Sequence, residues 1–175
     1  MHWMLALAML LGCERIEEIA PAPPLEGAAP PAPGRRSVRM TVDQLARSLP
    51  VVAGADDAGL PITWSYPDVV DAFALLGPTL GDPDYVRVTD EPAVADALYV
   101  KFMSDVALNV CAQMTDSTLV RFESFDENLR YLHLRFLGER LTDQPTSDAL
   151  RAVFDAGGWQ AVCVALIESP PFHIY

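Results

Sequence analysis

The side chains that most often carry out catalysis or bind metals are scarce in this sequence, which has three histidines and three cysteines among 175 residues. Only His133 and His173 lie beyond the first few residues, and a serine or cysteine nucleophile would need one of them as its base. The sequence also lacks a Gly-x-Ser-x-Gly motif, a glycine-rich phosphate-binding loop and a cluster of ligands spaced for zinc. It therefore gives no catalytic residue, no metal site and no cofactor.

Positive charge is equally scarce, because Lys101 is the single lysine and the net charge at pH 7 is −12. An acidic chain is repelled by nucleic-acid phosphates and by anionic lipid headgroups, so we expect no nucleic-acid partner and no flat adhesion to a membrane surface. No apolar stretch beyond the first dozen residues approaches the about 20 residues that a bilayer requires. The sequence therefore predicts no transmembrane helix.

A short apolar stretch, Trp3 to Leu11, leads into Leu10-Leu11-Gly12-Cys13 near the N-terminus. The stretch is too short to cross a bilayer and fits the apolar region of a signal peptide. The residues around the cysteine resemble the lipobox of bacterial lipoproteins. The resemblance implies that residues 1–12 are removed and that Cys13 carries lipid. The rest of the chain would then be anchored to the inner or outer membrane of the bacterial cell envelope, with its domain outside the cytoplasm.

Residues 13–39 are predicted to be a linker, because the segment from Ala20 to Gly34 contains six prolines interleaved with alanine. Such segments favour extended polyproline II and cannot build a core. A basic cluster of Arg35, Arg36 and Arg39 follows. We interpret this cluster as solvated, with contact to lipid headgroups or peptidoglycan as the alternative.

Two cysteines, Cys111 and Cys163, remain if Cys13 carries lipid. In an oxidising compartment an even number of cysteines predicts a disulfide, and both residues fall on apolar faces of predicted helices. The alternative is a pair of separate buried thiols, which pack as small hydrophobic side chains.

Apolar residues between 40 and 175 recur with the period of an α-helix, which predicts one all-α domain of five or six helices. The longest pattern runs from Pro92 to Met114, and we interpret it as the central and most buried helix. Its apolar face is predicted to consist of two adjacent lines: Leu98, Phe102, Val106 and Val110, and then Met103, Ala107, Cys111 and Met114.

Capping and stop signals predict the first helices of the domain. Thr41 and Gln44 form a capping box for a helix that Pro50 should end. A second helix is predicted over Asp68 to Leu76, with Gly77 as its stop.

Similar signals predict the later helices. Ser124 opens another capping box, and Gly138 should end the helix that follows it, whereas Thr118 to Phe122 is β-branched and is predicted to be extended. Two more helices are predicted over Asp143–Ala156 and Trp159–Glu168, separated by two glycines. The apolar tail after them is expected to dock on its own domain.

The loops over residues 51–66 and 77–92 hold aromatic and acidic side chains that could face a ligand. These side chains are Trp64, Tyr66, Asp82, Asp84 and Tyr85. Asp82, Asp84 and Asp90 could gather around calcium, but the spacing is not that of an EF-hand, and aspartate beside proline or glycine is ordinary turn chemistry. A hydrolase or redox site, or the pocket of a small-ligand carrier, would be built here.

The C-terminal third resembles a helical module of exported planctomycete and myxobacterial proteins, many of them associated with cytochromes. The matching pieces are Arg135-Phe136-Leu137-Gly138-Glu139-Arg140-Leu141-Thr142-Asp143, Val153-Phe154, and Ala165-Leu166-Ile167-Glu168-Ser169-Pro170-Pro171-Phe172. The resemblance implies a helical packing unit in an exported protein and carries over no catalytic residue. The Cys-x-x-Cys-His motif for covalent haem is absent.

These patterns favour a membrane-tethered, non-enzymatic lipoprotein that serves as an interaction or assembly subunit of an envelope complex. Its expected partners are the membrane, through the lipid on Cys13, and another envelope protein. A periplasmic hydrolase, a redox enzyme or a ligand carrier is the alternative.

Overall fold

The structure, a computed structural model, describes residues 38–68, 71–80 and 94–174. These residues form seven α-helices and one short 3-10 helix, and β-type pairing among them is limited to isolated bridges. All of these elements belong to one unit, Arg36–Tyr175. The predicted all-α fold is therefore confirmed. The lipobox, Cys13 and the proline-rich stretch lie outside the described residues.

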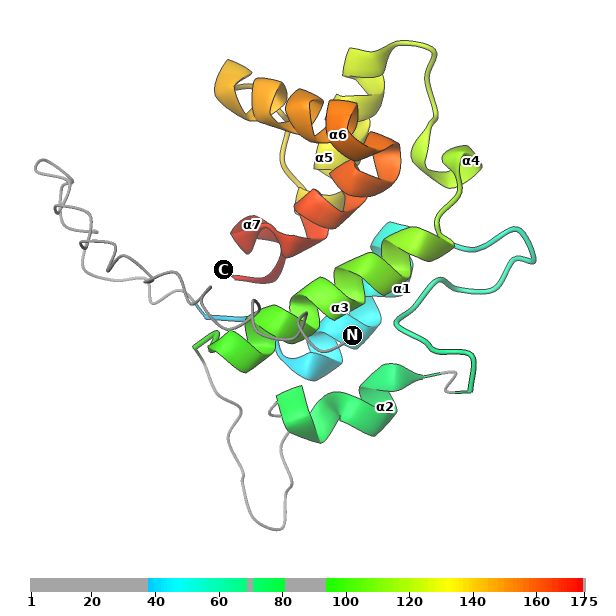
Figure 1. Ribbon diagram of the computed structural model, residues 1–175, viewed down its shortest axis with the longest axis vertical. Coiled ribbons are helices and arrows are strands. Elements are labelled where there is room, and N and C mark those ends of the chain that lie inside the picture. The colour runs from blue at the N-terminus through cyan, green and yellow to red at the C-terminus, as the bar shows by residue number, and fades with distance from the viewer. Residues whose placement is uncertain (1–37, 69–70, 81–93, 175) are drawn as a thin grey trace, which may run out of the picture. The chain divides into compact units, whose positions relative to one another are not determined.

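The central element is α3 (Ala97–Gln113), which crosses the middle of the domain with α5 and α6 on one side and α2 on the other (Figure 1). It begins at Asp96, whose carboxylate accepts a hydrogen bond from the Tyr99 N–H at 2.8 Å. Its buried side chains are Tyr99, Met103, Val106, Ala107, Val110 and Cys111. The prediction of a central helix is confirmed, and α3 packs mainly against α6 (Gln144–Glu168).

The predicted inward line on α3 is wrong at its first residue. Leu98 is 49% exposed, whereas its neighbour Tyr99 is 2% exposed. Each residue advances an α-helix by about 100°, so Leu98 lies more than about 100° around the axis from the buried Met103 and Val110. Apolar residues surround this helix, and periodicity alone could not select the side that is buried.

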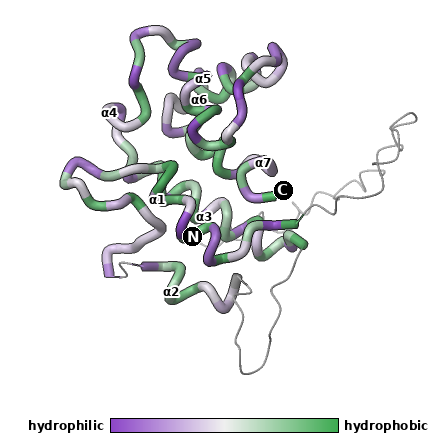
Figure 2. Tube along the Cα trace, turned by 180° about the vertical axis from the view of Figure 1, so that it is seen from behind, coloured by the Kyte–Doolittle hydropathy of each residue, from purple (hydrophilic) through white to green (hydrophobic). Residues whose placement is uncertain are grey.

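Local signals set the ends of α5 (Phe125–Leu137) and α6 as predicted. The Ser124 hydroxyl accepts a hydrogen bond from the Glu127 N–H, which is one of the two bonds of the predicted capping box; the return bond from the Glu127 side chain is not among the described contacts. Gly138 ends the helix with a φ of +70°, which favours glycine. Asp143 caps α6 in the same way, through a 2.9 Å bond. Along both helices hydrophilic and hydrophobic residues alternate in short patches, as expected for helices with one buried face (Figure 2).

Gly157 and Gly158 break α6 into two helical stretches, Gln144–Ala156 and Trp159–Glu168, as predicted. By length and composition, α6 is the one helix in the described ranges that could cross a membrane, although the sequence predicted none. Each stretch is shorter than the about 20 residues that a span requires. The second stretch buries four residues against the domain, Val162, Cys163, Leu166 and Ile167. We therefore assign α6 to the core.

Helix α1 (Val42–Ala53) continues past Pro50, where the sequence predicted its end. Proline removes one helical donor and usually breaks a helix interior. Here the last turn is held from outside, because the Arg135 guanidinium of α5 donates hydrogen bonds to the carbonyls of Val52 and Ala53. The predicted capping box at the start of α1 is present.

The helix predicted over residues 68–76 is shorter than expected. Helix α2 (Ala72–Leu76) begins after Asp71, whose carboxylate caps it. Gly77 does not stop the helix, because its φ of −48° is helical and the chain continues into η1 (Gly77–Leu80). A glycine ends a helix where it adopts a positive φ, and Gly77 does not do so.

Two single-turn helices complete the fold. Helix α4 (Asp116–Leu119) includes Thr118 and Leu119, the first two residues of the segment predicted to be extended, and the chain leaves the helical conformation at Val120. Helix α7 (Pro170–His173) follows α6 directly. The tail docks on the domain as predicted, because Phe172 and His173 are both buried.

Candidate functional sites

Trp64, predicted to face a ligand, is instead fully buried. Its indole ring lies edge-on to Phe73 of α2, with the ring centroids 5.2 Å apart, and to Phe102 of α3 at 5.9 Å. Tyr66 is 41% exposed and contacts the Trp64 ring at its outer side. Trp64 therefore joins α2 to α3 as a core residue. The remaining members of the predicted site, Asp82, Asp84 and Tyr85, lie outside the described residues, as does Asp90.

Two amide side chains of α3 hold the backbone on either side of Trp64. The Asn109 side chain accepts from the Ser65 N–H at 3.0 Å and donates to the Ser65 carbonyl at 2.6 Å, as a neighbouring β-strand would. Gln113 donates to the Thr63 carbonyl at 2.8 Å and to the Asn109 side chain at 2.9 Å. Sequence reasoning missed this amide clamp, because its partners are more than 40 residues apart.

A disulfide joins Cys111 of α3 to Cys163 of α6, with 5.9 Å between the Cα atoms. Both residues are buried, and the Met114 sulfur lies 3.6 Å from the sulfur of Cys163. Closing a loop of this length stabilises the fold by about 4 kcal/mol in the chain-entropy treatment. Among the described helices, α3 and α6 have the most extensive mutual packing, and the disulfide joins them.

The N-terminal segment of the described domain meets its C-terminal tail beside α3. The Met40 N–H donates to the His173 carbonyl at 2.7 Å, and Arg39 forms an antiparallel bridge with Ile174. Arg39 is 3% exposed, and its guanidinium lies 4.6 Å from the centre of the Tyr99 ring. The prediction of a solvated basic cluster is therefore wrong for Arg39, because its charge is placed over an aromatic face.

His173 is 4% exposed, and its ring lies 5.6 Å from that of Tyr99. Nε2 is 3.3 Å from the Glu168 carbonyl, and Nδ1 has no hydrogen-bond partner. Burial lowers the pKa of His173 below its ordinary value of 6.5, and the hydrogen bond to Glu168 opposes this shift. The side chain is therefore a neutral core histidine near pH 7.

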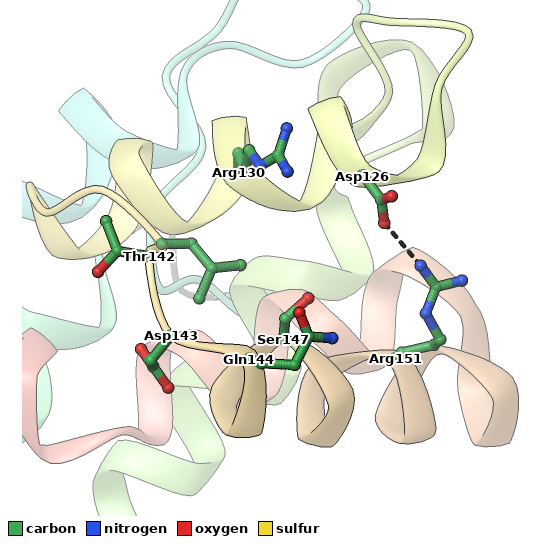
Figure 3. A pocket seen from close by; sticks show the side chains of 8 residues that line it. Asp126, Arg130, Thr142, Asp143, Gln144, Ser147 and Arg151 are labelled. Carbon is green, nitrogen blue, oxygen red and sulfur yellow. Dashed lines mark hydrogen bonds and ion pairs between the residues drawn. The ribbon is translucent and has the colours of Figure 1, made fainter.

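A small polar hollow of about 130 Å³ lies between α5 and the beginning of α6 (Figure 3). It is lined by Asp126, Arg130, Leu141, Thr142, Asp143, Gln144, Ser147 and Arg151. Figure 3 shows Asp126 and Arg151 directed toward each other, and their charged atoms form an ion pair of 2.6 Å. The guanidinium of Arg151 also lies 4.3 Å from the centre of the Phe125 ring.

Two charged groups of this hollow, Asp143 and Arg151, are already engaged, and Arg130 is the one cation of its lining without an ion pair among the described residues. The Asp143 carboxylate occupies the positive end of α6, and hydrogen bonds from the side chain and then the backbone of Thr146 lower the pKa of Asp143. Arg151 is neutralised by Asp126. Neither histidine of the domain lines the hollow, so its Ser147 hydroxyl has no imidazole base there. The geometry is that of a solvated helix junction.

His133 plays a structural role. It is 8% exposed, and its Nδ1 lies 2.9 Å from the Glu139 carbonyl, which fixes the turn after α5. Within residues 38–68, 71–80 and 94–174, histidine, cysteine and acidic side chains form no group of three or more that could hold a metal ion.

Comparison of the chain with models of protein families, with curated proteins and with solved structures gave no match.

Proposed function

We propose that this chain is a bacterial lipoprotein whose helical domain is held on a lipid tether outside the cytoplasm, where it serves as an interaction or assembly subunit. The observation that carries the proposal is the Cys111–Cys163 disulfide. Stable disulfides belong mainly to oxidising compartments, so the bond supports export. It also uses two of the three cysteines and leaves Cys13, directly after Gly12, as the remaining one.

An interaction role agrees with what the described residues do chemically. The two histidines of the domain are buried and serve the fold, and in the polar hollow beside α6 the Arg151 guanidinium is paired with Asp126. Trp64 belongs to the core. The enzyme and carrier alternatives therefore depend on Asp82, Asp84 and Tyr85, and no described contact favours them.

Lipid attachment is tested by metabolic labelling of cells with a fatty acid that carries a clickable group. We expect the wild-type chain to be labelled and to sediment with membranes, and the Cys13→Ser variant to lose both properties. Cys111→Ser combined with Cys163→Ser is the control, because it removes the two disulfide-bonded cysteines together and should leave labelling intact. An unlabelled wild-type chain, or label that persists in Cys13→Ser, would contradict the proposed anchor.

The interaction role needs a separate experiment. Cells that express the lipidated chain are treated with a membrane-impermeant crosslinker, and the chain is then purified from solubilised envelopes. We expect a reproducible crosslinked envelope protein that is lost when the chain is expressed as Cys13→Ser. Recovery of the chain alone would count against an assembly role while leaving the lipid anchor untouched.

A further inference from the structure

Helix α3 carries a second stripe of side chains, on the side opposite its buried face. The stripe, which we name the outer stripe, consists of Leu98, Lys101, Asp105, Leu108 and Ala112. Leu98 and Leu108 are 49% and 57% exposed, and the side chains of Lys101 and Asp105 are 65% and 36% exposed. Folding of the domain therefore does not account for the two leucines.

The spacing of the outer stripe is that of a coiled-coil seam. Its members follow one another at intervals of three, four, three and four residues, which is the repeat that keeps side chains on one line between two packed helices. The two leucines flank a charged pair, in which the Lys101 Nζ lies 2.7 Å from a carboxylate oxygen of Asp105 on the same helix. The stripe is thus apolar toward both ends and charged at the centre.

Four members of the outer stripe, Leu98, Lys101, Asp105 and Leu108, are also symmetric about residue 103. When a second copy of α3 is laid antiparallel across that point, Leu98 meets Leu108 and Lys101 meets Asp105, in both directions at once. A two-fold interface requires this kind of self-complementarity, in which residue i contacts residue j and j contacts i. A parallel arrangement would place Lys101 against Lys101 and Asp105 against Asp105, which is repulsive.

We infer that the outer stripe is a self-association surface on which two copies of this chain pair antiparallel through α3. The two leucine contacts supply apolar burial, and the central charges set direction and register. One helix pair buries less than the about 800 Å² per partner of a standard interface, so the dimer is weak in dilute solution. The inference concerns the folded domain and does not depend on the lipid anchor.

The first test measures association by sedimentation velocity on the full chain, with Cys13→Ser present throughout so that lipid cannot drive clustering. We expect a concentration-dependent dimer. The dissociation constant of Leu108→Glu should be at least about tenfold higher, because the change removes apolar burial twice per dimer. Leu75→Glu is the matched control, since Leu75 is a 62% exposed leucine on α2 and should leave association unchanged. A chain that stays monomeric, or a dimer indifferent to Leu108→Glu, overturns the inference.

The second test determines whether the two α3 helices pair antiparallel or parallel. Leu98→Cys and Leu108→Cys are prepared separately and then mixed under mild oxidation. The antiparallel pair predicts a crosslink between the two variants in the mixture and little in Leu98→Cys alone, because equivalent 98 positions would lie about 15 Å apart along the axes. Efficient crosslinking of Leu98→Cys with itself would indicate a parallel pair and overturn the inference.

The third test addresses the central charges. Lys101→Asp alone should weaken the dimer, because it places two aspartates across from each other at both contacts. The exchange of both charges, Lys101→Asp with Asp105→Lys, should restore it, because the antiparallel pairing is complementary again. Failure of the double exchange to recover association would contradict the proposed register.

Discussion

The α5–α6 pair and the segment from Gly54 to Leu76 are held by different kinds of interaction. In the pair, each helix is capped by its own preceding residue, Ser124 or Asp143, and the glycines that end or break the helices are local. In the segment, a short α2 is preceded by loop backbone that α3 holds through distant side chains such as Asn109. The first region is thus specified by neighbours in sequence, and the loop before α2 in the second region by neighbours in space.

The two sides of α3 therefore have different structural roles. Toward α6, its buried face and the Cys111–Cys163 bond fix the core. Toward α2, Trp64 and the amide clamp position a loop that would otherwise expose backbone groups to water. The outer stripe plays neither role, which leaves it available for association.

Removing the disulfide should lower the stability of the domain more than any other change proposed below. Cys111→Ser combined with Cys163→Ser should lower the free energy of unfolding by about 4 kcal/mol, because the unfolded chain regains the entropy of an open loop. Urea unfolding followed by circular dichroism gives the value. Cys13→Ser is the control and should change it little. A loss below about 1 kcal/mol in the double variant would mean that packing between α3 and α6 does not need the bond.

The next largest effect is expected where α5 holds the end of α1, directly before the segment from Gly54 to Leu76. Arg135→Met should destabilise the domain by about 2–3 kcal/mol, because three carbonyls, those of Val52, Ala53 and Thr118, lose a charged donor. Urea unfolding measures the loss, and hydrogen exchange should place the local opening at the end of α1. Arg130→Met, an exposed arginine on the same helix, should be nearly neutral. Equal effects of the two changes would argue against a specific role for Arg135.

A smaller loss is expected at the amide clamp. Asn109→Ala should cost about 1–2 kcal/mol, because the N–H and carbonyl of Ser65 both lose their partner. Faster amide exchange should be confined to residues near Trp64 and should spare α5 and α6. Val100→Ala, at a 55% exposed position of the same helix outside the outer stripe, is the control. Exchange that accelerates throughout the domain would erase the proposed difference between the two regions.

The smallest expected effect is a pH dependence from His173, which links the tail to α3. Because burial lowers the pKa of His173 in the folded chain, the unfolded chain binds the proton more readily. The stability contribution is complete above the ordinary pKa of 6.5 and is lost as the pH falls below it. Unfolding measured between pH 7.5 and 5 should therefore show a decline that His173→Phe reduces. An equal decline in that variant would assign it to other groups.

The parts of the fold that sequence predicted are those with local signals. Ser124, Gly138 and the Gly157-Gly158 break each act on the helix that contains or adjoins them, so their effect can be read from a few residues. Pro50 misled the prediction because Arg135, more than 80 residues away, supports the last turn of α1. The spacing of residues around Pro50 cannot reveal such a distant contact.

Which apolar side chains are buried and which are exposed could not be predicted from local sequence. Trp64 follows a glycine- and aspartate-rich loop and suggested a ligand site, but its burial depends on Phe73 and Phe102 from two other helices. The sequence pattern also predicts a buried Leu98, because α3 is apolar on several sides, but Leu98 is 49% exposed in the packed domain. The pairing of Cys111 with Cys163 was predictable by number and is confirmed by geometry.

The central claim is that a disulfide-bonded helical domain is held outside the cytoplasm by lipid on one cysteine. Intact-mass spectrometry of the chain purified from envelopes without reducing agent tests it most directly, because one spectrum reports the N-terminus, the acyl groups and the oxidation state. We predict a chain that begins at Cys13, carries lipid, and gains two hydrogens only after reduction. A chain that begins at Met1, bears no lipid and has free thiols at Cys111 and Cys163 would contradict the account.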